Sequence, residues 1–177
     1  MSRSALLTYA DYAALPNDGK RYELHAGALS VTPAPSPQHQ IILGNLFVHL
    51  DGHVRRHALG RVLVAAVDVI FSNITVLQPD IVWLDSSRLG AISRRAIEGP
   101  PTLAVEILSP STARTDRTTK RALYRRHGVP WLWLVDPEQR TIEVYRDDER
   151  VMVASGAEPA DLPPFEQLGL VVDSIWD

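Results

Sequence analysis

The sequence predicts an α/β domain in which a mixed central sheet is flanked by helices. A long segment, 37–58, carries apolar residues at helical spacing. Five strand-like runs follow it, and the third is apolar on both faces apart from one glutamate. A second helical segment, 116–127, separates the third run from the fourth, as in a crossover between strands of one sheet.

Length and composition set the broad class of protein. The chain has 177 residues and is 45% hydrophobic, which suits one domain with its own core. We interpret residues 1–177 as that domain, with an N-terminal extension at 1–35 and a tail at 150–177 packed on the core. Cysteine is absent, which excludes disulfides and thiolate metal sites and fits the cytoplasm. No apolar run has the length of a signal peptide or membrane span, so we expect a cytoplasmic protein without a membrane partner.

The N-terminal third predicts two helices and a hairpin. A short helix is expected at 8–15, with Thr8 as N-cap and Asp11 in the capping-box position. Two short strands then flank a turn at Ala26 and Gly27. Ser36 and Pro37 have the N-cap and first-turn chemistry of a helix start. The helix that follows, ended by Gly60, has one apolar stripe, formed by Ile42, Leu46, Leu50 and Val54.

The remaining elements give the order helix, three strands, helix, two strands. The expected strands are 61–71, 75–85, 101–109, 131–136 and 141–146. Beyond 150, the short apolar pieces predict a last strand and a final turn.

Two carboxylates stand in otherwise apolar strands. Asp80 follows Gln78-Pro79, and Glu106 lies in the run LAVEIL. Burial of a carboxylate is costly unless a cation pairs with it, and two on adjacent strands repel each other unless a cation or proton lies between them. Carboxylate oxygens suit Mg²⁺ or Mn²⁺. The alternative is structural, with Glu106 paired to an arginine such as Arg114 or Arg121.

Several separated motifs resemble the Uma-type endonuclease family of the PD-(D/E)XK superfamily. They are QPDIVWLD, LAVEILSPST, a helix with Lys120 and Tyr124, and HGVPWLWLVDP, preceded by YELHAG and PAPSPQHQ. The likeness extends from about residue 6 to 147. It implies a restriction-endonuclease-like αβββαβ core with the site at one sheet edge.

The resemblance also implies roles for individual residues. Asp80 and Glu106 would bind the divalent metal. The superfamily's lysine normally lies two residues after the glutamate, but this chain has Leu108 there, and the resemblance points to Lys120 instead. Glu23 matches a carboxylate that the superfamily often adds from an early element. Asp116 precedes Lys120 by one helical turn, so these two side chains could instead pair with each other.

Other residues are candidates for substrate binding. His39 in the first turn of the long helix could contact a phosphate, or be a capping-region side chain. Gln78 has the strand parity of Asp80 and could line the site or only the sheet edge. The basic residues crowded into 114–126 are either a phosphate-facing strip or a solvated helix face, and the expected phosphate contacts are Arg114, Arg117 and Arg121. The net charge of −3 argues mildly against a broad DNA-binding surface.

The sequence therefore predicts a Mg²⁺-dependent endonuclease that hydrolyses nucleic acid, with DNA as the favoured substrate. We expect a homodimer, with the strand WLWLVD and the apolar tail as the self-association surface. The alternative is a nuclease fold without catalysis that binds DNA or protein. A third hypothesis is a zinc site on the helix face formed by His49, His53 and His57, although no further ligand is evident and a solvated face or dimer contact is favoured.

Overall fold

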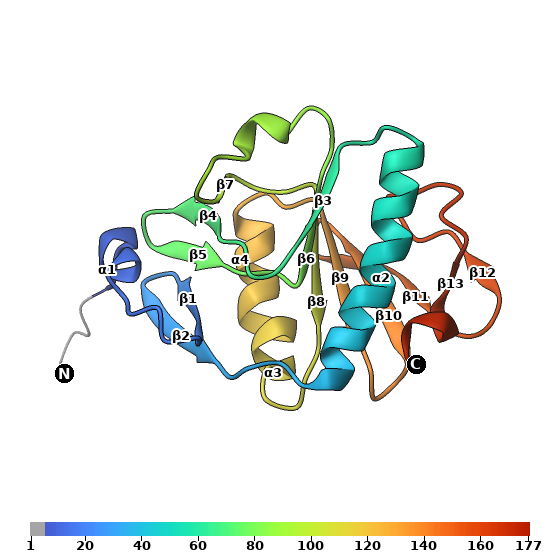
Figure 1. The fold of residues 1–177 in the computed structure, drawn as a ribbon, viewed down its shortest axis with the longest axis horizontal. Coiled ribbons are helices and arrows are strands. Elements are labelled where there is room, and N and C mark those ends of the chain that lie inside the picture. The colour runs from blue at the N-terminus through green and yellow to red at the C-terminus, as the bar shows by residue number, and fades with distance from the viewer. Residues whose placement is uncertain (1–5) are drawn as a thin grey trace.

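A six-stranded mixed sheet forms the centre of the computed structural model, which describes residues 6–177 (Figure 1). Residues 1–5, part of the expected N-terminal extension, lie outside the described residues. The strand order is β11 (Glu149–Ala154), β10 (Thr141–Arg146), β9 (Trp131–Asp136), β8 (Leu103–Ile107), β6 (Ile81–Leu84) and β3 (Arg61–Val64). Only β8 and β9 pair in parallel within this sheet, as a helical crossover between them requires.

A second sheet of five short strands lies beside the first. Its order is β2 (Ala28–Thr32), β1 (Arg21–His25), β5 (Thr75–Leu77), β4 (Val69–Ser72) and β7 (Ile97–Glu98). The β1–β2 hairpin turns at Ala26 and Gly27, as predicted, and both residues have positive φ. The tail adds a small pair, β12 (Pro159–Ala160) and β13 (Leu170–Val171).

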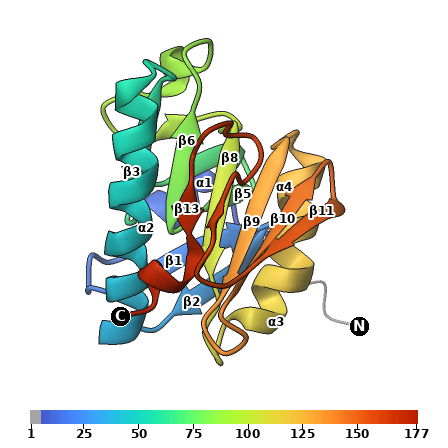
Figure 2. The ribbon, with the colours of Figure 1, turned by 90° about the vertical axis from the view of Figure 1, so that its right-hand side faces the viewer.

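Helices cover both faces of the six-stranded sheet (Figure 2). The helical elements are α1 (Tyr9–Ala13), α2 (Pro37–Arg56), α3 (Ala113–Thr115), a π-helical turn (Asp116–Lys120), α4 (Arg121–Arg126) and two 3-10 turns (Leu89–Ala91 and Val172–Ile175). The expected apolar stripe of α2 packs on one face, against side chains of β6, β8 and β9. Leu123 and Tyr124 of α4 pack on the other. Along the chain, α2, β3, β6, β8, α4 and β9 give the predicted αβββαβ order.

The predicted N-caps of the first two helices are confirmed, and each helix ends two residues earlier than expected. Thr8 and Asp11 form the capping box of α1, and the Ser36 hydroxyl accepts a hydrogen bond from the His39 N–H at the start of α2. Helix α2 ends at Arg56, four residues before Gly60. At Gly60 φ is 118°, and a Cβ would lie 2.0 Å from the Leu84 carbonyl oxygen, so this crossing into β3 requires glycine.

Two predicted strands were wrong in their extent. The run 61–71 divides into β3 and β4, and the run 75–85 divides into β5 and β6, so each contributes to both sheets. Pro79 lies at the second break, and proline lacks the N–H that a continuous central strand needs. The helix expected at 116–127 begins at Ala113 and includes the π-helical turn.

The expected self-association surface is buried within the chain itself. Strand β9, which is the WLWLVD segment, lies between β8 and β10. The tail packs on the same core as α2 through Leu162, Phe165, Leu170 and Trp176. The homodimer therefore stays a prediction, without the surface that suggested it.

The α2 histidines make contacts within the fold. His53 is buried and packs against His57 and Phe165, with ring centroids 4.6 Å and 5.6 Å away, while His49 lies near the Ser174 hydroxyl. Within residues 6–177 no group of three or more His, Asp or Glu side chains is placed to hold a metal ion by itself. Every helix of that same part of the chain is too short or too polar to cross a bilayer.

Candidate active site

Strand register brings Asp80 and Glu106 side by side. Ile81 of β6 pairs with Val105 of β8, and one further step along this antiparallel pair places Asp80 opposite Glu106. Asp80 also donates its backbone N–H to the Val105 carbonyl oxygen and accepts the Ile107 N–H on Oδ2 at 2.8 Å. Both carboxylates are almost fully buried, at 3% and 2% exposure. Glu106 lies on β8, an inner strand of the six-stranded sheet, and Asp80 immediately precedes β6, the neighbouring strand.

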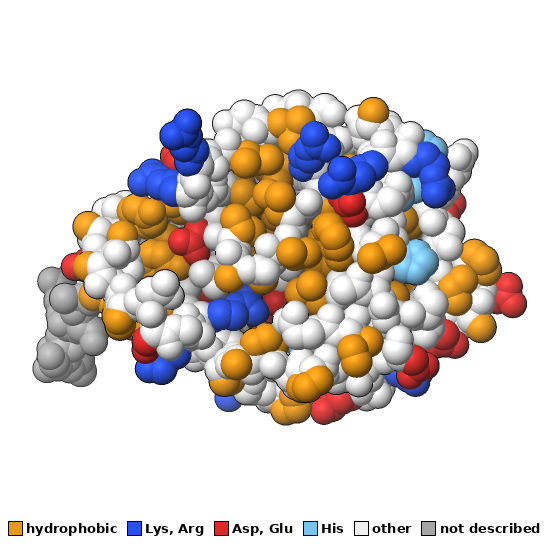
Figure 3. All heavy atoms as spheres, in the orientation of Figure 1, with side chains coloured by type: hydrophobic (Ala, Val, Ile, Leu, Met, Phe, Trp, Pro, Cys, Tyr) orange, Lys and Arg blue, Asp and Glu red, His pale blue; other side chains and the backbone are white. Residues whose placement is uncertain are grey.

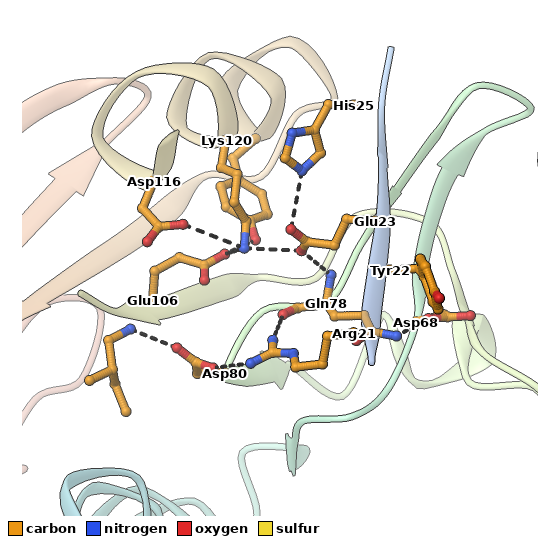
Figure 4. Close-up of polar contacts among 12 residues, drawn as sticks. Arg21, Tyr22, Glu23, His25, Asp68, Gln78, Asp80, Glu106, Asp116 and Lys120 are labelled. Atoms are coloured by element: carbon orange, nitrogen blue, oxygen red, sulfur yellow. Dashed lines mark hydrogen bonds and ion pairs between the residues drawn. The ribbon is translucent and has the colours of Figure 1, made fainter. Parts of the chain in front are cut away.

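Lys120 is the cation at the centre of this cluster. The π-helical turn presents both Asp116 and Lys120 to the interior, where each is 4% exposed. The Lys120 Nζ lies 2.6 Å from Glu106 Oε1, 3.0 Å from Glu23 Oε1 and 3.7 Å from Asp116 Oδ1 (Figure 4). Lys120 therefore joins three carboxylates rather than pairing with Asp116 alone.

Glu23 approaches from the five-stranded sheet and is held on three sides. Its Oε1 accepts the Gln78 backbone N–H at 2.6 Å as well as contacting Lys120. Its Oε2 lies 3.1 Å from His25 Nε2. Burial opposes ionisation of Glu23, but Lys120, His25 and the Gln78 N–H outweigh it and lower the pKa of Glu23 to about 2.

Glu106 has the opposite electrostatic balance. Burial, together with the negative charges of Asp116, Asp80 and Glu23, raises its pKa well above the ordinary 4.5, despite the contact with Lys120. The Tyr124 hydroxyl donates a hydrogen bond to Oε1. Within residues 6–177 no hydrogen bond or ion pair uses Oε2 of Glu106. Glu106 thus has one oxygen, Oε2, without a partner in the described chain, and the positive charge near it is too small to keep its pKa in the ordinary range.

Asp80 has its own set of partners. Arg21 Nη1 lies 3.1 Å from Oδ1, and His39 Nε2 lies 3.2 Å from Oδ2. Burial works against the charged form, but His39, Arg21 and the Ile107 N–H lower the pKa of Asp80 below its ordinary value. Arg21 Nε and His39 Nδ1 are buried and have no hydrogen-bond partner within the described chain.

These groups line one cavity of about 340 Å³. Its floor contains Asp80, Glu106 and Lys120, and its walls come from two segments far apart in sequence, 30–36 and 109–112. In ionised form, the four carboxylates of the cluster face two cations, Arg21 and Lys120, which leaves a surplus of two negative charges. A divalent cation would balance that surplus.

A family model named Uma2, described as "Putative restriction endonuclease", matches residues 9–173. The chain belongs to this family. The motif resemblance found in the sequence is thereby confirmed. The crystal structure of "a putative nuclease belonging to DUF820" from Anabaena variabilis ATCC 29413 matches this Uma2 chain with a TM-score of 0.76 at 23% identity. The match covers 96% of this chain and 97% of that one, and it confirms the predicted fold. A comparison with curated proteins gives no match.

Within this Uma2 chain, the structure brings five predicted site residues together. Glu23, His39, Asp80, Glu106 and Lys120 all line the cavity. Leu108 is buried among apolar side chains of β8 and α4, which explains why the position two residues after Glu106 carries no lysine. Glu106 pairs with Lys120, not with Arg114 or Arg121 as the structural alternative supposed.

Four predicted substrate contacts lie outside the cavity. Arg117 pairs with Asp136 and Glu143, Arg121 pairs with Asp148, and Arg114 is exposed. The Gln78 side chain instead donates to Asp68 at 2.7 Å. The break at Pro79 ends the strand parity that made Gln78 a neighbour of Asp80.

Arg21 was missed by the sequence analysis. It precedes Glu23 by two residues in β1, so both side chains lie on one face of that strand. Once Glu23 is placed in the site, this alternation places Arg21 beside it. The spacing of Arg21 and Glu23 is visible in the sequence, but it predicts a shared strand face only once residues 21–25 are assigned to a strand.

Proposed function

We propose that the chain is a metal-dependent endonuclease that hydrolyses phosphodiester bonds in DNA, with the cavity as its active site. The observation that carries the proposal is the juxtaposition of Asp80, Glu106 and Lys120 on the floor of one cavity. The Uma2 family and the similar protein from Anabaena variabilis are both described as nucleases, which supports the same function.

The donor set fits Mg²⁺ or Mn²⁺. Asp80 and Glu106 would hold the ion, since oxygen ligands are preferred by both metals and the Glu106 Oε2 has no other partner in the described chain. Mg²⁺ commonly uses one or two carboxylates and completes its shell with water and substrate phosphate, so three protein ligands are not required. When bound, such an ion lowers the pKa of a coordinated water and neutralises charge on the phosphate.

Lys120 supplies fixed positive charge beside the scissile phosphate. Burial alone would favour the neutral amine, but Glu106, Glu23 and Asp116 raise the pKa of Lys120 above its ordinary value, so the ammonium persists. An ammonium only donates hydrogen bonds; it can orient the attacking water or stabilise charge on a phosphate oxygen. In the hydrolysis, the water oxygen bonds to phosphorus and releases a proton to solvent, one P–O ester bond breaks, and the leaving oxygen takes a proton from solvent.

Glu23, Asp116, His39 and Arg21 position the reacting groups. Glu23 and Asp116 contact the ammonium of Lys120 in addition to Glu106 and so help to fix its position. His39 and Arg21 hold the two oxygens of Asp80. Both residues also line the cavity, so they fix Asp80 at its surface.

The test combines metal binding with cleavage. Mn²⁺ is titrated calorimetrically into the wild type, Asp80→Ala and a control, Asp148→Ala, whose carboxylate pairs with Arg121 outside the cavity. Cleavage of single-stranded DNA and of a plasmid in Mn²⁺ is then measured on the same proteins and on Lys120→Ala, with cleavage of either substrate counted as activity and circular dichroism used to check folding. We expect the wild type and Asp148→Ala to bind and cleave, Asp80→Ala to lose metal binding, and Lys120→Ala to lose cleavage. A wild type that binds no metal contradicts the proposal.

A nuclease fold without catalysis is the second candidate, favoured by Leu108 at the usual lysine position. The proximity of Lys120 to Glu106 argues against it, because the Lys120 ammonium lies 2.6 Å from Glu106 Oε1 and could serve in place of the missing lysine. In the same experiment, metal binding without cleavage by the folded wild type would support this candidate.

A further inference from the structure

The carboxylates lie at the bottom of a narrow cavity. One wall is the end of the β1–β2 hairpin with the linker to α2, and the other is the loop after β8. The cavity volume of about 340 Å³ lies at the small end of the range for small-molecule pockets, roughly 300–1,000 Å³. Such a space admits a group of nucleotide size but not a whole double helix.

A phosphate of a nucleic acid can reach the cavity floor only if the adjacent nucleotides allow it to leave the stacked structure and enter the cavity. In a duplex, each phosphate is fixed on the outside of a stacked, paired structure, and adjacent phosphates of a strand are spaced by about 3.4 Å along the axis. A single strand can unstack and splay its bases, so one phosphate can enter while the bases turn away. Asp80 is 3% exposed and Glu106 is 2% exposed, so the substrate phosphate must enter the cavity to contact them.

The charges around the cavity also do not suit a duplex. Proteins that hold duplex DNA commonly neutralise 6–10 phosphates with lysine and arginine, as a rough guide. The two cations of the cavity, Arg21 and Lys120, are already in ion pairs. On the face seen in Figure 3, lysine and arginine side chains lie in separate groups along the upper edge, near the centre and along the lower edge, and form no continuous track across the face.

The cavity walls offer contacts of another kind. Hydroxyls of Ser109, Ser111 and Thr112 lie on one wall and can donate hydrogen bonds to phosphate oxygens. Pro33 and Pro35 on the opposite wall present apolar surface to a base or sugar. Both kinds of contact serve a flexible strand that passes between the walls.

We propose that the cavity takes one strand of nucleic acid at a time, so that the enzyme cuts single-stranded segments and not intact duplex. The cleavage part of this inference rests on the proposed nuclease function, whereas the preference for binding a single strand does not. Substrate would therefore be a loop, tail or separated strand.

Binding is measured by the fluorescence anisotropy of a labelled oligonucleotide, alone and annealed to its complement. Ca²⁺ is present to neutralise the carboxylates, and gels confirm that the oligonucleotide stays intact. We expect the single strand to bind at least about tenfold more tightly than the duplex, with a weaker salt dependence than 6–10 phosphate contacts would give. Equal or tighter duplex binding, or no binding of either, overturns the inference.

Two matched variants place the binding in the cavity. Ser111→Trp adds bulk at an exposed position on the cavity wall, and Thr119→Trp adds the same bulk at an exposed position outside it. We expect Ser111→Trp to weaken single-strand binding and Thr119→Trp to leave it unchanged. Equal effects of the two variants contradict a strand held in the cavity.

Cleavage of the two substrates in Mg²⁺ or Mn²⁺ separates this inference from the proposed function. Faster cleavage of the single strand supports both. Cleavage of duplex at an equal or greater rate overturns the strand inference and leaves the nuclease proposal standing. Single-strand preference in binding with no cleavage of either substrate supports the strand inference and contradicts the nuclease.

Discussion

The helical segment from α3 to α4 has two faces on which charges are handled in opposite ways. On the inner face, Lys120 is 4% exposed and contacts three buried carboxylates. On the outer face, Arg117 and Arg121 pair with acidic residues near solvent, and about a third of each arginine side chain is exposed. One short stretch of sequence therefore holds a buried charge cluster and an ordinary ion-paired surface.

The difference shows where charge is retained for reasons other than stability. Exposed ion pairs contribute about 0.2–1 kcal/mol, and they cost little to maintain. Buried ions must overcome desolvation, and replacing a buried pair with apolar residues is often neutral or stabilising. A cluster with more carboxylates than cations is thus a poor stabilising device, which is consistent with the proposed role as a binding site for a further cation.

The largest expected effect comes from removing the buried cation. Lys120→Met leaves Glu23, Glu106 and Asp116 without their shared partner, and we expect a loss of about 3–5 kcal/mol in the free energy of unfolding. Urea denaturation measures it. Adding Glu106→Gln should recover part of the loss, because one uncompensated buried charge is removed. A single-variant cost below about 1 kcal/mol, typical of a surface pair, would contradict the buried-cluster interpretation.

A second effect is the dependence of the folding stability on pH, to which Glu106 and Glu23 contribute with opposite sign. The pKa of Glu106 is raised, so the folded protein holds this proton more tightly than the unfolded chain does. Its contribution to stability is present below the ordinary carboxyl range and is lost as pH rises through the folded-state pKa. For Glu23, with a pKa of about 2, the contribution is present above that range and is lost as pH falls towards 2.

Metal affinity should follow the ionisation of Glu106. We expect Mn²⁺ binding to strengthen with pH, by up to about tenfold per unit for one released proton, until Glu106 is fully ionised. Asp116→Asn removes a neighbouring negative charge that raises this pKa, and it should move the profile to lower pH. Calorimetry at several pH values measures both proteins. Identical profiles would show that Asp116 does not influence the site.

The smallest effect is expected on the outer face. Arg121→Met breaks an exposed ion pair with Asp148 and should cost less than about 1 kcal/mol in stability. It should also leave cleavage near the wild-type rate, because Arg121 does not line the cavity. A large loss of cleavage in a stable Arg121→Met protein would restore the phosphate-contact role that the sequence suggested.

The site residues that are easiest to predict from the sequence are charged side chains within apolar, buried segments. Asp80 and Glu106 stood out because carboxylates are rare in apolar strands, and the strand order placed them on neighbouring strands. Lys120 needed the family resemblance, because nothing local shows that a helical lysine points inward. The π-helical turn that directs it has no evident signal in the sequence DRTTK.

The division into two sheets was harder to predict. Apolar character continues through the break after Val64, where Ala65, Ala66 and Val67 follow, so hydrophobic pattern alone extends that strand too far. Pro79 marked one break, but the other required knowledge of the tertiary contacts that turn the chain. The outward direction of the Gln78 side chain follows from that same break.

The cluster around Lys120 draws on parts of the chain that are far apart in sequence. Glu23 belongs to the first hairpin, and Lys120 lies beyond the midpoint of the chain. During synthesis, at about 5–20 residues per second, the hairpin emerges seconds before the helix that completes its charge pairing. A chain interrupted before residue 120 carries the carboxylates without their ammonium, so translation must pass that point before the site can form.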